Sequence, residues 1–235
     1  MPSLADIADL VRARRPAAAP YVIGVTGAVA AGKSTFAGEL AEAIAAWPDH
    51  PRFEIVNTDG FLFANAVLDA RGLTLRKGFP ETYDAAALGV ALAAIRSGPA
   101  DFPGYSHVIY DVDPALTRRI ERPDVLIVEG LGLQDDPRAG GLDTLIYLDA
   151  DEADLEAWFT ERFLGLWRAA EHDPASFYAR FRTLDEAGAR AFAGQVWRAI
   201  NLPNLREHIV RARDHADIVV RKGAGHAVEA VTVRG

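Results

Sequence analysis

Short runs of consecutive apolar residues recur along the chain, separated by longer segments with helical character. The runs predicted to be strands are 21–26, 53–58, 125–128, 144–148, 218–221 and 227–233. Most of them are apolar at nearly every position, as is typical of parallel strands that helices cover on both faces. This alternation predicts an α/β fold built on a mostly parallel sheet with helices on both faces.

The segments between these runs have the spacing or composition of helices. Leu4, Ile7, Leu10 and Val11 fall on one face of a short N-terminal helix. Asp84 is a candidate N-cap for a later helix. The remaining predicted helices are 34–47, 84–97, 152–168, 186–200 and 205–213. Two long stretches without a regular pattern, 60–81 and 99–105, are expected to be loops, and loops of that length are often functional.

Length and composition limit the size and the surroundings of this fold. The chain has 235 residues, of which 50% are hydrophobic, so one compact domain is predicted over 1–235, with 1–18 as an N-terminal helix and linker. It has no cysteine, which excludes disulfides and thiolate chemistry. Neither a signal-peptide core nor a run of about 18 apolar residues occurs, and we therefore expect a cytoplasmic protein that does not bind membranes.

The charge balance narrows the range of partners. Lys and Arg number 25 and Asp and Glu number 33, which gives a net charge of −8. An acidic chain is a poor candidate for non-specific nucleic-acid binding, so a small-molecule partner is expected. Any anionic substrate must then be held by a few local cations.

A glycine-bearing loop between the first predicted strand and the next helix carries the strongest chemical signal. It fits the pattern GxxxxGK[ST] and consists of Gly27, Ala28, Val29, Ala30, Ala31, Gly32, Lys33 and Ser34, followed by Thr35. Such a P-loop wraps backbone N–H groups around a nucleotide phosphate, and the start of the helix adds partial positive charge. Lys33 would reach the β- and γ-phosphates, and the Ser34 hydroxyl would ligate Mg²⁺. A chance glycine-rich turn is the alternative, but the strand before it and the helix after it favour a P-loop that binds the phosphates of a nucleotide, ATP or GTP.

Two carboxylates follow predicted strands directly. Asp59 comes after the second strand and Glu129 after the third. Ligands of open α/β sheets bind beyond the carboxyl ends of the strands, so both side chains are expected to face the P-loop. One would orient an attacking hydroxyl and the other would hold the metal or its water. The alternative is that each only caps a turn.

Arg162 interrupts an apolar stripe of the predicted helix 152–168. The stripe consists of Leu155, Trp158, Phe159, Phe163, Leu166 and Trp167. A guanidinium facing inward there needs an anionic partner, and a substrate carboxylate bound bidentately is one candidate. A snorkelling side chain or a structural ion pair is the alternative.

Several motifs together resemble bacterial type I pantothenate kinases, within the wider group of phosphoribulokinase and uridine kinase-like P-loop kinases. The matching segments are 58–62 (TDGFL), 65–68 (NAVL), 71–73 (RGL), 76–84 (RKGFPETYD), 105–111 (YSHVIYD), 127–131 (IVEGL) and 225–229 (GHAVE). The resemblance implies an ATP-dependent kinase that phosphorylates the primary hydroxyl of pantothenate, the first step of coenzyme A synthesis. It also suggests a homodimer.

The resemblance also implies roles for individual residues. Asp59 would be the base, Lys33 and Lys77 would neutralise the transferred phosphoryl group, and Ser34 and Glu129 would serve Mg²⁺. The positions that match pantothenate contacts are Tyr105, His107, Arg162 and Asn204, and those on the nucleotide side are Lys222 and His226.

Taken from the residues alone, several of these positions have plainer interpretations. Lys77 would be solvated, His107 would be structural, and Asn204 would cap the helix from 205. Tyr105 would be a packed aromatic, and His226 would only pack or cap.

The chain departs from the pattern of this family at several places. Only about twenty residues precede the first strand, where the family usually carries a longer segment. Phe159 replaces a usual tyrosine, Leu166 replaces a phenylalanine of the pantothenate pocket, and Gly38 replaces an arginine that binds coenzyme A. The departures predict weak inhibition by coenzyme A. They leave open a kinase for another hydroxyl metabolite, such as a sugar, glycerate or nucleoside, and a nucleotide-binding switch is the alternative of a different class.

Overall fold

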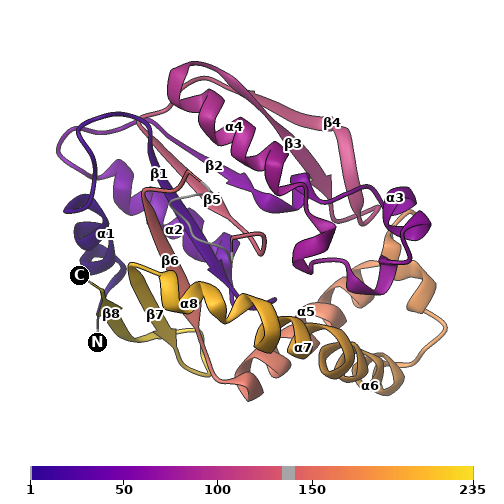
Figure 1. The fold of residues 1–235 in the computed structure, drawn as a ribbon. Coiled ribbons are helices and arrows are strands. Elements are labelled where there is room, and N and C mark those ends of the chain that lie inside the picture. The colour runs from indigo at the N-terminus through magenta and orange to yellow at the C-terminus, as the bar shows by residue number, and fades with distance from the viewer. Residues whose placement is uncertain (1, 134–140, 235) are drawn as a thin grey trace.

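A six-stranded sheet forms the centre of the protein (Figure 1). The computed structural model describes residues 2–133 and 141–234. The strands are β1 (Tyr21–Gly27), β2 (Phe53–Asn57), β5 (Val125–Glu129), β6 (Thr144–Asp149), β7 (Ile218–Lys222) and β8 (Val228–Val233). Their order across the sheet is β2-β5-β1-β6-β7-β8, and only β8 runs antiparallel to its neighbour. The predicted α/β class with a mostly parallel sheet is confirmed.

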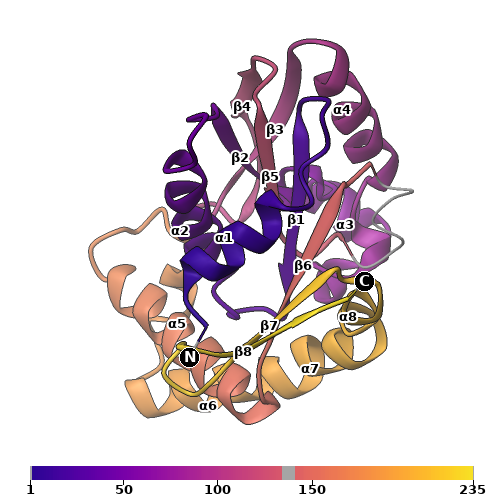
Figure 2. The ribbon, with the colours of Figure 1, turned by 90° about the vertical axis from the view of Figure 1, so that its left-hand side faces the viewer.

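The position of the two central strands, β1 and β5, explains why their sequences are almost entirely apolar. β1 and β5 are buried at every position and pair with each other from Tyr21 opposite Val125 onward. α2 (Lys33–Ala45) contacts β1, β2 and β5, whereas α8 (Arg211–His215) contacts β1 and β6. Figure 2 shows α2 and α8 on opposite sides of the sheet. Because neither face meets water, no polar alternation develops along these strands.

The N-terminal helix is part of this packing. α1 (Leu4–Arg12) begins at Ser3, whose hydroxyl accepts the Asp6 N–H while the Asp6 carboxylate accepts the Ser3 N–H. This reciprocal capping satisfies two N–H groups at the start of the helix. Ile7 and Val11 are fully buried, and α1 packs against α2. Within the described residues, no helix is long and apolar enough to cross a bilayer.

A two-stranded hairpin extends the molecule beside the sheet. It consists of β3 (Ala100–Ser106) and β4 (Asp111–Ile120), which pair antiparallel. The prediction of a loop at 99–105 was wrong, because the Pro-Gly pair within β3 sits at an irregularity of the register and not at the end of the strand. The hairpin lies directly on the turn that follows β2, where a Cβ on Gly60 would come within 1.9 Å of the Pro103 carbonyl oxygen. Only glycine permits this close approach.

The predicted loop 60–81 contains short helices. They are 3₁₀ helices at Thr58–Phe61, Thr74–Arg76 and Pro80–Thr82, and the helix α3 (Asn65–Ala70). α4 (Ala85–Ser97) follows and begins at Asp84, whose carboxylate accepts the Ala87 N–H, as predicted.

A helical lobe completes the molecule at the carboxyl ends of the strands (Figure 1). α5 (Glu152–Ala169) packs against α6 (Glu186–Val196) around a small core of its own, which includes Phe163 and Trp167. Between them lies a 3₁₀ helix at Phe177–Phe181.

The helix of α6 does not end near residue 200 as predicted. It continues through a π-helical turn at Trp197–Asn201, α7 (Leu202–Asn204) and a second π-helical turn at Leu205–Ile209 into α8. Pro203 would break a regular α-helix. The wider π turns on both sides carry the backbone past it, and such turns often mark functional sites.

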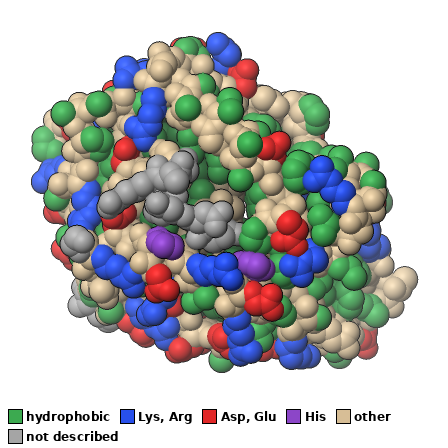
Figure 3. All heavy atoms as spheres, in the orientation of Figure 1, with side chains coloured by type: hydrophobic (Ala, Val, Ile, Leu, Met, Phe, Trp, Pro, Cys, Tyr) green, Lys and Arg blue, Asp and Glu red, His purple; other side chains and the backbone are tan. Residues whose placement is uncertain are grey.

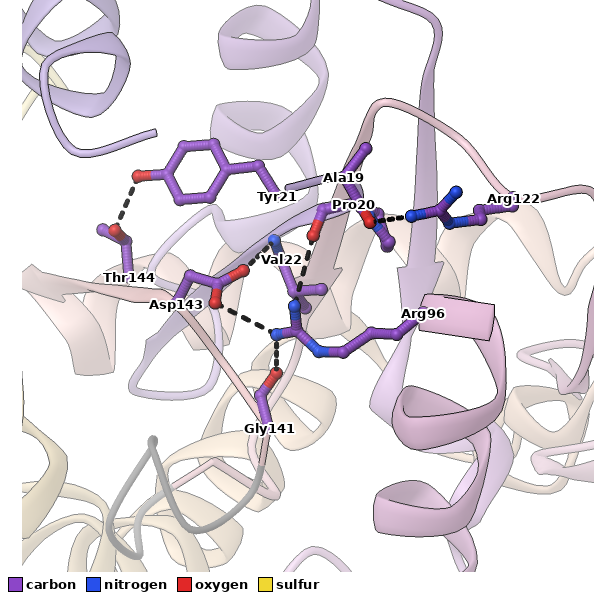
Figure 4. Close-up of polar contacts among 9 residues, drawn as sticks. All are labelled: Ala19, Pro20, Tyr21, Val22, Arg96, Arg122, Gly141, Asp143 and Thr144. Carbon is purple, nitrogen blue, oxygen red and sulfur yellow. Dashed lines mark hydrogen bonds and ion pairs between the residues drawn. The ribbon is translucent and has the colours of Figure 1, made fainter. Parts of the chain in front are cut away.

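The opposite end of the sheet is held by a cluster of polar contacts (Figure 4). The Asp143 carboxylate accepts the Val22 N–H at 2.8 Å and an Arg96 N–H at 3.1 Å. The Arg96 guanidinium also donates to the carbonyl oxygens of Gly141 and Pro20. These contacts fasten the end of α4 to the amino ends of β1 and β6, well away from the P-loop.

Candidate active site

A large cavity lies where the carboxyl ends of the strands meet the hairpin and the helical lobe. Its volume is about 1030 Å³, and its lining includes the P-loop, the turn after β2, the segment 74–83 and one side of α5. The predicted site residues that line it are Val29, Ala30, Gly32, Lys33, Ser34, Thr35, Asp59, Lys77, Tyr105, His107, Glu129, Arg162 and His226. A cavity of this size accommodates two small molecules side by side.

The P-loop has the backbone that its pattern requires. Gly32 lies at the N-cap of α2 with φ 82°, a left-handed conformation, and a Cβ there would approach Lys222 Nζ to 2.9 Å. Gly27 also has a positive φ of 146°. Glycine tolerates both conformations without strain, so the loop curls over the start of α2, where unpaired N–H groups and the helix dipole favour an anion.

The chain has three lysines, and all of them lie at this cavity or directly beneath it. Lys33 is half-buried and donates to the carbonyl oxygens of Gly27 and Ala28 at 3.2 and 2.8 Å. Burial lowers the pKa of Lys33 to about 8, although the nearby carboxylates of Glu129 and Asp59 oppose this shift.

Lys222 lies under the P-loop and supports it. Its side chain is 6% exposed, and Nζ donates to the Ala31 carbonyl oxygen at 2.8 Å. Burial lowers the pKa of Lys222. The neighbouring His226 stacks on Trp158 with 3.8 Å between ring centroids. The packing interpretation of His226 therefore holds for one face of the ring, and the residue also lines the cavity.

Glu129 forms the inner wall beside the P-loop. It is 4% exposed, and one carboxylate oxygen accepts the Ser34 hydroxyl at 2.8 Å and the Asn57 amide. Both Ser34 and Glu129 were predicted to serve a metal, whereas Asn57 was not singled out by the sequence. An asparagine at the end of a strand is a common turn residue, and only its partners mark it as part of the site.

Asp59 lines the cavity from the turn after β2 and is held in place by its neighbours. Its N–H donates to Asn57 Oδ1 at 2.6 Å, and its carboxylate accepts the Tyr83 hydroxyl at 3.2 Å. Tyr83 is 8% exposed, and burial raises its pKa. The hydroxyl therefore stays protonated and remains a donor.

Lys77 is fixed and not solvated, so the plainer interpretation of this residue was wrong. Its ammonium donates to Asn65 Oδ1 at 2.6 Å and to the Tyr110 carbonyl oxygen at 2.7 Å, and lies over the rings of Tyr105 and Tyr110. Burial lowers the pKa of Lys77, and the carboxylates of Asp111 and Asp59 raise it. The loop that carries Lys77 thus presents a cation next to Asp59.

Aromatic side chains form the far end of the cavity. Tyr105 meets the rings of His107 and Tyr110 edge-on at 5.1 and 6.1 Å, and Tyr110 stacks on Phe177 at 4.4 Å. Partial burial lowers the pKa of His107, which keeps its imidazole neutral near pH 7. This end of the cavity suits a ligand with an apolar body and a few polar groups.

Arg162 projects into the cavity from α5. The sequence predicted a guanidinium that faces inward; the residue is exposed to solvent and lines the cavity beside part of the apolar stripe. Among the described residues, many arginines of the helical lobe form ion pairs with carboxylates, but Arg162 does not. A structural ion pair therefore does not account for it within the described part of the chain. Phe159 and Leu166 lie beside it on the cavity wall.

Asn204 does not line the cavity, and its predicted contact with an acceptor is corrected here. It is 2% exposed, and its amide donates to the Gly78 carbonyl oxygen at 2.9 Å. The alternative of a helix cap is also wrong, because Asn204 lies inside the continuous helical segment. Asn201, in the preceding π-helical turn, lines the cavity instead. Asn201 and Asn204 are the same residue type three positions apart, so the sequence alone does not show which of them lines the cavity.

The Ser34–Glu129 pair fits a magnesium ion by its chemistry. A hydroxyl and a buried carboxylate are oxygen donors of the kind that Mg²⁺ prefers, and Mg²⁺ commonly takes few protein ligands when phosphates supply the others. The described residues contain no group of three or more His, Asp or Glu arranged to hold a metal.

A comparison with known families defines the class of protein. The model of the Phosphoribulokinase / Uridine kinase family matches residues 22–159, more than half of the chain. The chain therefore belongs to this family of P-loop kinases, and membership implies that it is a small-molecule kinase that uses ATP.

Similar sequences narrow the class. A pantothenate kinase of Sorangium cellulosum (strain So ce56) is 49% identical over 224 residues, which cover 92% of this chain and 73% of that protein. A pantothenate kinase of Leifsonia xyli subsp. xyli is 46% identical over 230 residues, covering 94% and 71%. Within its family, the chain belongs with the pantothenate kinases, and the predicted resemblance is confirmed.

Solved structures share the fold. A kinase of Silicibacter sp. TM1040 assigned to a fructose transport system superposes with a TM-score of 0.72 at 25% identity, over 92% of this chain and 96% of that one. A D-glycerate 3-kinase of Cryptococcus neoformans has a TM-score of 0.67 at 13% identity, over 98% and 99% of the two chains. The second likeness concerns the fold alone.

Proposed function

We propose that the protein transfers the γ-phosphoryl group of ATP to the primary hydroxyl of pantothenate, the first step of coenzyme A synthesis. The observation that carries the proposal is the joining of three features in one cavity. These are a P-loop with Lys33, a carboxylate at Asp59, and an arginine, Arg162, without an ion pair among the described residues. Together they suit a nucleotide, a hydroxyl and an anionic acceptor.

The nucleotide half of the cavity supplies charge neutralisation. The amides of the P-loop and the start of α2 would hold the β- and γ-phosphates, with Lys33 turning from the loop carbonyls toward them. Lys222 and His226 would lie on the nucleotide side, with Lys222 keeping the loop in shape through Ala31. Positioning and charge account for most of the catalysis of phosphoryl transfer.

The transfer itself is an in-line displacement. The acceptor oxygen forms a bond to the γ-phosphorus while the bridging bond between the β- and γ-phosphates breaks, and ADP leaves. Asp59 accepts the proton of the acceptor hydroxyl, and Lys77 compensates negative charge on the moving phosphoryl group.

Ser34 and Glu129 would hold the magnesium ion that accompanies ATP. When bound, Mg²⁺ neutralises charge on the phosphates and fixes their orientation. The role of this chain is to place one hydroxyl and one buried carboxylate beside the P-loop.

The acceptor half would recognise pantothenate by both of its ends. The carboxylate of pantothenate would pair with Arg162, bidentately where the geometry allows. Its dimethyl group and chain would lie against the aromatic wall at Tyr105 and Tyr110, with His107 and Asn201 as hydrogen-bonding groups.

The base assignment is tested with Asp59→Asn, which removes the proton acceptor and keeps the shape. We expect kcat to fall by about 100- to 10,000-fold, because general-base catalysis contributes that much. Affinity for ATP, measured by titration without acceptor, should stay within about twofold, since general-base contacts act on the acceptor. Near wild-type turnover in the variant would show that Asp59 is not the base.

A kinase for a hydroxyl metabolite related to pantothenate is the second candidate function, because two residues of the acceptor half differ from the family pattern. Leu166 and Phe159 line the acceptor half, where the resemblance led us to expect an aromatic ring and a hydroxyl. A smaller side chain and a missing donor change which molecules fit, and a screen of hydroxyl acceptors that carry a carboxylate tests this directly.

A further inference from the structure

The carboxylate proposed as the base is tethered from two sides by residues that the sequence did not mark. Asn57 ends β2 and precedes the turn that carries Asp59. Tyr83 lies 24 residues after Asp59 in the chain. Each makes a direct contact with Asp59, and each also belongs to a second part of the site.

Asn57 joins the base to the nucleotide half. Its Oδ1 accepts the Asp59 N–H at 2.6 Å, and its amide nitrogen donates to the same Glu129 oxygen that accepts the Ser34 hydroxyl. Only this orientation of the amide satisfies both partners, because an N–H requires an acceptor and a carboxylate requires a donor. The position of the Asp59 turn is thereby set against the P-loop helix.

Tyr83 joins the base to the loop of Lys77. Its hydroxyl donates to Asp59 Oδ1 at 3.2 Å. The backbone around it is paired with the segment just after Asp59, since the Asp84 N–H donates to the Phe61 carbonyl oxygen at 2.8 Å and the Phe63 N–H donates to that of Thr82 at 2.9 Å. The ring itself is buried, so packing restricts the movement of the hydroxyl that donates to Asp59.

The two contacts restrict how the Asp59 carboxylate is presented. The Tyr83 hydroxyl occupies one oxygen, Oδ1, which leaves Oδ2 to receive the proton of an acceptor hydroxyl. Asn57 holds the backbone N–H of Asp59, and Tyr83 holds its carboxylate, so the residue is constrained at its backbone and at the tip of its side chain.

We propose that Asn57 and Tyr83 are positioning residues that hold the Asp59 carboxylate in register with the P-loop and with Lys77. The proposal rests on the proposed role of Asp59 as the base. Misplacement of a reacting group by about 1 Å costs on the order of 100-fold in rate. Loss of either residue should therefore lower kcat more than it changes substrate binding.

Tyr83→Phe is the direct test because it removes one hydroxyl from a buried ring. We expect kcat to fall about 10- to 100-fold, as is typical when a supporting hydrogen bond behind a functional group is lost. The KM values for ATP and acceptor should stay within about twofold, so that kcat and kcat/KM fall together.

Tyr21→Phe is the matched control. Tyr21 is also buried at the opposite end of β1, where its hydroxyl donates to the Val11 carbonyl oxygen at 3.1 Å and lies 2.6 Å from Thr144 Oγ1 (Figure 4). This variant loses two buried hydrogen bonds away from the cavity and is expected to unfold at a lower temperature while kcat stays unchanged. The pair separates positioning from general stability.

Asn57→Asp isolates the contact with Glu129. The new carboxylate still accepts the Asp59 N–H, but it repels Glu129 where the amide donated. We expect a fall in kcat at least as large as for Tyr83→Phe, with ATP affinity measured separately by titration. Asn57→Ser restores a neutral short acceptor and should recover part of kcat relative to Asn57→Asp.

The outcomes distinguish this proposal from the proposed function. If wild-type protein phosphorylates an acceptor other than pantothenate, the substrate assignment is wrong, and the variants are then compared on that acceptor. Unchanged kcat in Tyr83→Phe and Asn57→Asp, or a rise in KM at constant kcat, overturns the positioning roles whichever acceptor is used. A fall in kcat at constant KM, with Tyr21→Phe fully active, supports them.

Discussion

At the scale of single residues, Arg162 is the side chain that we propose distinguishes between acceptors. Its guanidinium faces the cavity from α5, next to Phe159 and Leu166, and the described residues offer it no ion pair. A guanidinium that lines the cavity without an ion pair to the described residues can bind a carboxylate of the acceptor. The sequence placed this residue on the correct helix, and the apolar stripe around it divides between the core, which holds Leu155 and Trp167, and the cavity wall, which includes Phe159 and Leu166.

Arg162→Ala should therefore discriminate between acceptors that differ only in charge. We expect KM for pantothenate to rise by about 10- to 200-fold, which corresponds to the 1.5–3 kcal/mol of a charge-assisted hydrogen bond. KM for pantothenol, which carries an alcohol in place of the carboxylate, should change less than about threefold. Coupled measurement of ADP with both acceptors checks this, and an equal loss for both would place Arg162 elsewhere in the mechanism.

Lys33 predicts how ATP binding depends on pH. Burial lowers the pKa of Lys33 to about 8, so in the free protein the ammonium loses its proton as pH rises through that value. Phosphates bind the charged form, and the affinity for ATP should fall above pH 8, approaching about tenfold per pH unit. Titrations between pH 7.5 and 9.5 measure the slope.

Lys33→Arg is the control for this slope. A guanidinium stays charged throughout the range, so the variant binds ATP more weakly but with little dependence on pH. Burial also lowers the pKa of Lys222, and the control removes only the contribution of Lys33. A wild-type affinity that is constant up to pH 9.5 would contradict the assignment.

At the scale of elements, the helical segment 186–215 connects the two halves of the cavity. Its π-helical turn at Trp197–Asn201 presents Asn201 to the cavity, while Asn204 reaches the Gly78 carbonyl oxygen beside Lys77. The same residue type thus lines the cavity at one position, where we propose that it contacts the acceptor, and supports the Lys77 loop three positions later.

The two asparagines should respond differently to truncation. Asn204→Ala leaves the buried Gly78 carbonyl without its partner and is expected to lower the free energy of unfolding by about 1–3 kcal/mol. Asn201→Ala should leave that free energy within about 0.5 kcal/mol, as for other partly exposed side chains, and raise the KM for the acceptor. Urea unfolding with parallel kinetics checks both. The opposite assignment of the two effects would restore Asn204 as the acceptor contact.

The elements also show which parts of the fold were predictable. The buried strands β1 and β5, the P-loop and the Asp84 cap follow from local patterns and were predicted within a few residues. The hairpin β3–β4 was not, because its proline and glycine resemble those of a turn. The continuous helix past Pro203 depends on π-helical turns that no local pattern reveals.

The same distinction holds for the site. Residues with a motif, such as Lys33, Ser34 and Glu129, were found from the sequence and lie at the cavity. Asn57 and Tyr83 matter only through their partners across the fold, and those contacts between distant segments are set by tertiary packing.

At the scale of the whole molecule, the net charge of −8 coexists with a cation-rich cavity. The face drawn in Figure 3 mixes Lys and Arg with Asp and Glu side chains, without a large region of one sign. Most arginines of the surface form ion pairs with carboxylates, whereas two of the three lysines line the cavity and the third, Lys222, lies under the P-loop. We therefore propose that anion binding is local to the cavity and depends on the P-loop, the lysines and Arg162.

Steady-state phosphorylation of competing acceptors tests the central claim most directly. The purified protein would be given ATP and Mg²⁺ with pantothenate, D-glycerate, fructose or uridine, and ADP formation would be followed by a coupled assay. We predict kcat/KM for pantothenate at least roughly 100-fold above that for each other acceptor, because fructose and uridine carry no carboxylate for Arg162 and D-glycerate lacks the apolar body proposed to lie against Tyr105 and Tyr110. A higher value for any other acceptor, or ADP formation that does not depend on acceptor, would contradict the account.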